Sequence, residues 1–165
     1  MRRFQWASPA LLALIGGIGL AVGLLVYMTD RDPAHAMLFP AAAALGSGPI
    51  FGILGPCLPS FVHPFAFSLL SAALRAPRSG PGYGACAAWW AVNAAFEVGQ
   101  VPRVAALIAD GLHCAGIDGP LTRPLTNYLL RGGFDVGDLI AVTLGALAAA
   151  AVLRVVHRRE VCHVP

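Results

Sequence analysis

Four stretches of the chain consist almost entirely of apolar residues, and turns or charges bound each of them. The first, residues 9–28, has about twenty residues without a charge, enough to cross the roughly 30 Å core of a bilayer as a helix. Residues 83–100 and 136–156 also reach this length, whereas residues 58–74 complete a crossing only with help from the LGPCLPS run at their start. The pattern predicts an all-α, polytopic membrane protein with four transmembrane helices in one domain over residues 1–165.

The region between the first two segments is apolar as well, but prolines and glycines interrupt it. In MLFPAAAALGSGPIFGILGPCLP, these residues recur too often for a continuous helix. Irregular backbone survives at membrane depth only where protein covers it. We therefore predict a broken apolar hairpin, re-entrant or interfacial, in a first outer loop over residues 29–57. A fifth span is the alternative.

Arginine placement sets the expected orientation. Cytoplasmic ends of spans carry an excess of positive residues. With the amino terminus inside, seven arginines fall on the cytoplasmic side and four outside; the inside set is Arg2, Arg3, Arg75, Arg78, Arg154, Arg158 and Arg159, and the outside set is Arg31, Arg103, Arg123 and Arg131. Both termini are thus predicted to be cytoplasmic, with a second outer loop over 101–135 and a tail over 157–165. The first segment is longer than the apolar core of about 7 to 15 residues in a signal peptide, which favours a retained helix.

Composition agrees with this interpretation. The chain is 58% hydrophobic and 12% charged, with a mean hydropathy of +0.73, whereas soluble domains are about 45–50% apolar. All eleven cationic side chains are arginine and alanine is abundant, which indicates a GC-rich bacterial genome. The net charge of +3 is scattered, so nucleic acid is not an expected partner. We predict a multi-pass protein of the bacterial inner membrane, with membrane lipids as its partners.

Cysteines and histidines give no metal or cofactor pattern. Cys57 and Cys114 both fall in predicted outer loops, where they could form a disulfide or remain two thiols. The chain has no CxxC or CxxCH motif, so heme attachment and common zinc sites are not supported. No cofactor and no metal are predicted.

One face of the third segment is polar. Asn93, Glu97 and Gln100 are four and three residues apart, a spacing that puts them on the same side of a helix. An ionisable group at bilayer depth costs about 2.5–3.5 kcal/mol on insertion scales, so such a face is expected to point into the bundle. Glu97 is the leading candidate for function, and a structural ion pair with Arg103 or Arg131 is the alternative.

Other polar residues are predicted at the same outer level. His63 enters the second segment from that side, and Asp135 and Asp138 open the fourth. Each has a structural alternative: His63 could bond backbone at a helix end, and aspartates three apart before an apolar helix are typical of an N-cap followed by an acidic third residue.

Small residues recur every four positions along the first and last segments. Such spacing lets helix backbones approach closely in a membrane. The residues assigned to helix packing on this basis are Gly19, Gly23, Gly137, Ala141 and Gly145.

FEVGQ, followed after a loop by RGGFDVGDLIAVTLGAL, resembles the VanZ-like family of bacterial membrane proteins. The resemblance implies that Glu97, Gln100, Arg131 and Asp138 occupy the signature positions of the family. LPSFVHPFAFSLL is similar to its histidine-containing second helix, which adds His63, and the likeness extends over about residues 58–153. Val142 stands where members usually carry asparagine. Because the family has no generally established reaction, the resemblance implies a cell-envelope context without a mechanism.

Three classes of function follow from these observations. The first is a non-enzymatic envelope protein whose outer polar cluster packs the bundle or binds an anionic or lipid-linked headgroup, with Arg131 as the natural anion contact. The second is an accessory or structural subunit of a larger membrane complex. The third is an enzyme that modifies a lipid headgroup, with Glu97 or His63 as general base. We favour the non-enzymatic class.

Overall fold

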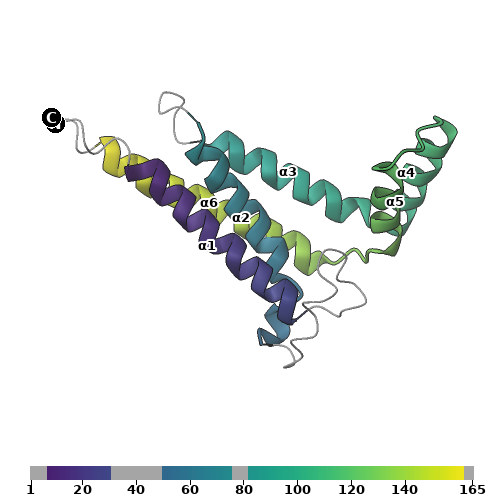
Figure 1. Ribbon diagram of the computed structural model, residues 1–165, viewed down its shortest axis with the longest axis horizontal. Helices are drawn as coiled ribbons and strands as arrows, with labels where there is room; N and C mark the ends of the chain where they lie inside the picture. The colour runs from purple at the N-terminus through teal and green to yellow at the C-terminus, as the bar shows by residue number, and fades with distance from the viewer. Residues whose placement is uncertain (1–6, 31–49, 76–81, 162–165) are drawn as a thin grey trace.

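The computed structural model describes residues 7–30, 50–75 and 82–161, which form helices joined by short connections (Figure 1). No strand occurs within these ranges, so the prediction of an all-α fold is confirmed. The helices are α1 (Ala7–Thr29), the 3-10 turn η3 (Gly52–Leu54), α2 (Leu58–Ala73), α3 (Tyr83–Gly99), α4 (Pro102–Cys114), α5 (Thr122–Arg131) and α6 (Val136–Val161). Most of the predicted broken hairpin, residues 31–49, lies outside the described residues.

Helix α2 lies at the centre of the bundle and packs against α1, α3 and α6. Successive long helices alternate in direction, so α1 begins and α6 ends at the same end of the bundle (Figure 1). One cluster of the buried core draws on all four of these helices. Its members are Leu12, Leu69, Cys86, Ala149 and Leu153.

Glycines bring the backbones of these helices close together. A Cβ added at Gly23 would lie 3.0 Å from Val62 of α2, and one at Gly19 would lie 3.4 Å from Ala66. Where α6 crosses α2, a Cβ on Gly145 would overlap the carbonyl of Phe61. Three of the predicted packing positions, Gly19, Gly23 and Gly145, therefore lie at contacts with α2, and at Gly145 a larger residue would have to push two helices apart.

Two helices occupy a region that the sequence suggested was a loop. Residues 102–114 and 122–131 form α4 and α5, which pack against each other. Val101 has an extended backbone and Pro102 occupies the first helical position, where a missing N–H costs nothing. On α4, Val104, Ala105 and Ile108 turn inward with helical spacing. The segments were missed because they are short and amphipathic rather than uniformly apolar.

Two of the described helices are long and apolar enough to cross a membrane by length and composition, over Pro9–Thr29 and Val136–Arg158. Helix α2 is apolar but has 16 residues, and α3 has 17. At 1.5 Å per residue each is about 24–26 Å long, less than a hydrocarbon core of about 30 Å. The four-span arrangement stays a prediction.

Candidate functional site

The start of α6 is fixed by an aspartate cap. Asp135 Oδ1 accepts a hydrogen bond from the backbone N–H of Gly137 at 2.7 Å. Its carbonyl oxygen accepts from the amides of Asp138 and Leu139 at 3.1 and 3.3 Å. Asp138 lies in the first turn, where a carboxylate interacts favourably with the helix dipole. The N-cap interpretation of this pair is therefore confirmed.

Cys57, the residue before α2, lies beside these carboxylates. Burial raises the pKa of the Cys57 thiol, and the negative charges of Asp138, Asp135 and Glu97 raise it further. A Cβ added at Gly137 would lie 3.5 Å from the Cys57 sulfur, an ordinary van der Waals contact, so the thiol lies close to the first turn of α6. The ends of α2, α3 and α6 thus converge, and the thiol at their meeting point is held in its protonated, weakly nucleophilic form.

Gln100 connects the end of α3 to the segment before α6. Its side chain is buried, and its amide nitrogen donates to the Tyr128 hydroxyl of α5 at 3.2 Å and to the Phe96 carbonyl at 3.4 Å. A Cβ on Gly132 would overlap the same amide. Gln100 therefore joins the end of α3 to α5 and to the segment before α6, a role that its place in the resemblance did not indicate.

Asn93 and Glu97 follow the inward face of α3 as predicted from their spacing. Glu97 is buried. Asn93 is half-buried and donates from its amide nitrogen to the Trp89 carbonyl at 2.7 Å, within its own helix. We call Cys57, Glu97, Gln100, Asp135 and Asp138 the end cluster, since all lie where α2, α3 and α6 meet.

His63 and Arg131 are exposed, unlike the buried members of the end cluster. His63 is exposed on α2, with its ring 6.0 Å from that of Phe67. Arg131 is exposed at the last residue of α5. Outside the predicted cluster, Arg123 forms an ion pair with Asp118.

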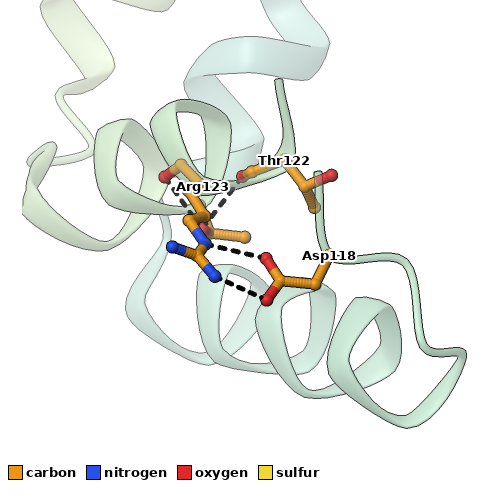
Figure 2. A network of polar contacts seen from close by, with 4 residues as sticks. Asp118, Thr122 and Arg123 are labelled. Atoms are coloured by element: carbon orange, nitrogen blue, oxygen red, sulfur yellow. Dashed lines mark hydrogen bonds and ion pairs between the residues drawn. The ribbon is translucent and has the colours of Figure 1, made fainter. Parts of the chain in front are cut away.

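That ion pair closes the connection between α4 and α5 (Figure 2). Arg123 donates from Nε and from a terminal nitrogen to the two carboxylate oxygens of Asp118, each at 2.9 Å. These hydrogen bonds and the charge of Arg123 lower the pKa of Asp118. Both side chains are exposed, so the pair sets the geometry of the connection more than it stabilises the fold.

The tryptophans of α3 donate hydrogen bonds to two neighbouring helices. Trp89 Nε1 donates to the Ser71 hydroxyl of α2 at 2.9 Å, and its ring stacks on Phe67 at 4.8 Å. Trp90 Nε1 donates to the Thr143 hydroxyl of α6 at 3.1 Å. The sequence signal for these bonds is the placement of serine and threonine inside apolar helices.

Asp30 is a polar anchor that the sequence analysis missed. Its carboxylate accepts from the Thr29 hydroxyl at 2.7 Å and from the backbone N–H groups of Ile50 and Phe51 at 3.0 and 2.9 Å. Burial acts to raise the pKa of Asp30, but these hydrogen bonds outweigh it and lower the pKa. The carboxylate therefore fixes the end of α1 to the turn that leads into α2.

The disulfide that we considered between Cys57 and Cys114 is not formed. Both residues are free thiols, as is Cys86. Cys57 precedes α2 whereas Cys114 ends α4, and α4 lies well away from the start of α2 (Figure 1).

Neither a metal site among the described residues nor a match to a known protein points to a function for the chain. Within the described ranges, no group of three histidine, cysteine, aspartate or glutamate side chains could hold a metal ion. No family model, curated protein or solved structure matches the chain. The likeness to the VanZ-like family stays a prediction.

Proposed function

We propose that the chain is a VanZ-like, non-enzymatic protein of the bacterial inner membrane, with four spans, cytoplasmic termini and an outward-facing end cluster that holds the helices together. One observation carries this proposal. Large apolar side chains are exposed along the outer faces of the long helices, while the buried Glu97 carboxylate and Gln100 amide lie with Asp135 and Asp138 at one end of the bundle.

The exposed faces suit a lipid environment. Leu14 of α1 is 60% exposed and Leu147 of α6 is 61% exposed, and many further residues on α1, α3 and α6 are similar. Monomeric soluble proteins rarely expose contiguous apolar areas of this extent. Lipid tails would cover these faces without cost, and the end cluster would then lie near the outer membrane surface.

Packing is the role that best fits the chemistry of the end cluster. Asp135 is occupied as a helix cap, and Gln100 bonds Tyr128 on the neighbouring helix. The thiol of Cys57 is held protonated. Asp135 and Gln100 form hydrogen bonds within the protein, and a protonated thiol is a weak nucleophile, which together favour a structural role over general-base chemistry on a lipid headgroup.

A role as an accessory subunit of a larger membrane complex is the second candidate. The same exposed faces would accept other helices as readily as lipid, and small residues such as Gly17 leave open space on the outer side of α1. Headgroup binding by the exposed Arg131 would add to either role, because its guanidinium can donate two parallel hydrogen bonds to an anion.

Membrane extraction and thiol labelling test this proposal. The chain should stay in the pelleted membranes after alkaline carbonate treatment. Cys114 is exposed at the end of α4, so an impermeant maleimide should label it in intact spheroplasts, while a Cys114→Ser variant should lose that labelling. A carbonate-soluble chain would refute membrane insertion. Labelling of Cys114 only after permeabilisation would refute the orientation.

A further inference from the structure

The helical hairpin α4–α5 has an exposed apolar stripe of its own. Leu121, the N-cap residue with a helical backbone conformation, Leu125 and Tyr128 are four and three residues apart, so they share one side of α5. All three are exposed, and Leu121 reaches 84%. Leu129, four residues after Leu125, borders this stripe, but it is buried and packs against Gly99 of α3. Tyr128 contacts α3 with part of its side chain, whereas Leu121, Leu125 and the rest of the Tyr128 side chain form an exposed apolar surface beside that contact.

This stripe continues an apolar face of α3. The Tyr128 ring meets the Phe96 ring edge-on, with centroids 6.1 Å apart. Phe96 is itself exposed on α3, on a face that the proposed function assigns to lipid. An apolar surface thus passes from α3 to α5 through two aromatic rings.

The placement of the hairpin suits the surface of a bilayer. It lies across the end of α3, at an angle to the long helices (Figure 1). Tyrosine is enriched at membrane interfaces because it has an apolar ring and a polar tip. The Tyr128 hydroxyl accepts a hydrogen bond from Gln100, and the charged Arg131 follows three residues later. An apolar stripe beside arginine is typical of helices that lie in the membrane surface.

We propose that α5 lies in the outer interface of the lipid bilayer, with Leu121, Leu125 and Tyr128 inserted among the lipids and Asn127 facing water. This inference rests on the proposed membrane insertion and adds a contact that none of the predicted spans makes. Its occupant is the bilayer of the membrane that holds the chain, rather than a second protein.

Spin-label accessibility tests the placement in the full chain, reconstituted into phosphatidylcholine–phosphatidylglycerol vesicles. The label is attached to Leu121→Cys or Leu125→Cys in a background whose four native cysteines are alanine. Leu121 is so exposed that replacing it removes little packing. Asn127→Cys is the matched control on another side of α5, and Leu14→Cys reports the proposed lipid face of α1. Labels on the stripe should collide with oxygen and be shielded from a polar nickel chelate, and the Asn127 label should behave in the opposite way.

The outcomes separate this inference from the proposed function. Water contact at Leu121 and Leu125 combined with lipid contact at Leu14 would overturn the interfacial placement alone. Water contact at Leu14 as well would overturn membrane insertion itself.

A second measurement needs no substitution and is independent of how the variants fold. The unmodified chain is reconstituted with a lipid carrying a photoreactive diazirine near its headgroup, and adducts are located by mass spectrometry. Adducts within Leu121–Tyr128 support the placement. Adducts on α1 and α6 with none in this peptide would overturn it.

Discussion

The crossing of α2 and α6 makes the sharpest stability prediction. A Cβ on Gly145 would overlap the backbone carbonyl of Phe61 and lie 3.1 Å from Pro64 Cγ. A backbone carbonyl cannot rotate away as a flexible side chain can, so Gly145→Ala must move one helix relative to the other. Overpacking of this kind costs about 1–3 kcal/mol.

The matched control is Gly17→Ala on α1, where an added Cβ would meet no atom within 4 Å. Both variants gain similar helix propensity, up to about 1 kcal/mol per replaced glycine. That gain cancels when the two are compared, so Gly145→Ala should be less stable than Gly17→Ala by about 1–3 kcal/mol.

The measurement is unfolding of the purified chain in detergent micelles, followed by loss of helical circular dichroism. The midpoint of Gly145→Ala should fall well below that of Gly17→Ala, which should equal or exceed the parent. Equal midpoints for the two variants would show that the helices do not cross at Gly145, and would refute the close approach argued from the glycine positions.

Three further outcomes are expected. Asp135→Ala should destabilise the chain by about 0.5–2 kcal/mol in the same unfolding assay, whereas Asp135→Asn, which keeps a capping oxygen, should recover most of the loss; equal losses would exclude capping. The folded-state pKa of Asp30 lies below its ordinary value of 3.8. The hydrogen bonds from Ile50 and Phe51 to its carboxylate should therefore be complete above that pH and lost as pH falls through the folded pKa. Amides of Ile50 and Phe51 that stay equally protected from hydrogen exchange under strong acid would contradict this. Cys57, with a raised pKa, should react with maleimide more slowly at neutral pH than exposed Cys114; equal rates would argue against its burial beside the carboxylates.

The long helices could be predicted from the sequence, because an uninterrupted apolar run of this length is compatible with few structures other than a helix. The observed α1 and α2 begin and end close to residues 9–28 and 58–74, and α3 and α6 lie similarly close to their predicted ranges. Helices α4 and α5 were not anticipated, because a short amphipathic segment gains its stability from packing that only the folded chain supplies.

The end cluster was predictable in part. Alternating helix directions bring Glu97, Asp135 and Asp138 to one end whatever the details of packing. The rotation of α2 about its own axis decides how far the His63 side chain is exposed, and no spacing pattern reports that rotation. His63 is exposed, whereas Glu97 is buried.

A hydrogen bond between a side chain and a backbone group leaves no pattern in the sequence. Asp30 bonds two amides twenty and twenty-one residues further on, and any residue except proline could supply them. Gln100 was identified by its position in a motif, but its contact with Tyr128 required a helix that was not predicted.

The hydrogen bonds of the Asp30 carboxylate have a practical consequence for engineering the chain. One carboxylate holds the chain at residue 30 and again at residues 50 and 51, so residues 31–49 enter and leave the bundle at a single point. The entropy of closing a connection grows slowly with its length, by about 0.6 kcal/mol for each doubling. An epitope or fluorescent reporter inserted between residues 31 and 49 should therefore leave the helices assembled, and co-expressed fragments split there should reassociate through the packing of α1 against α2 and the hydrogen bonds of Asp30.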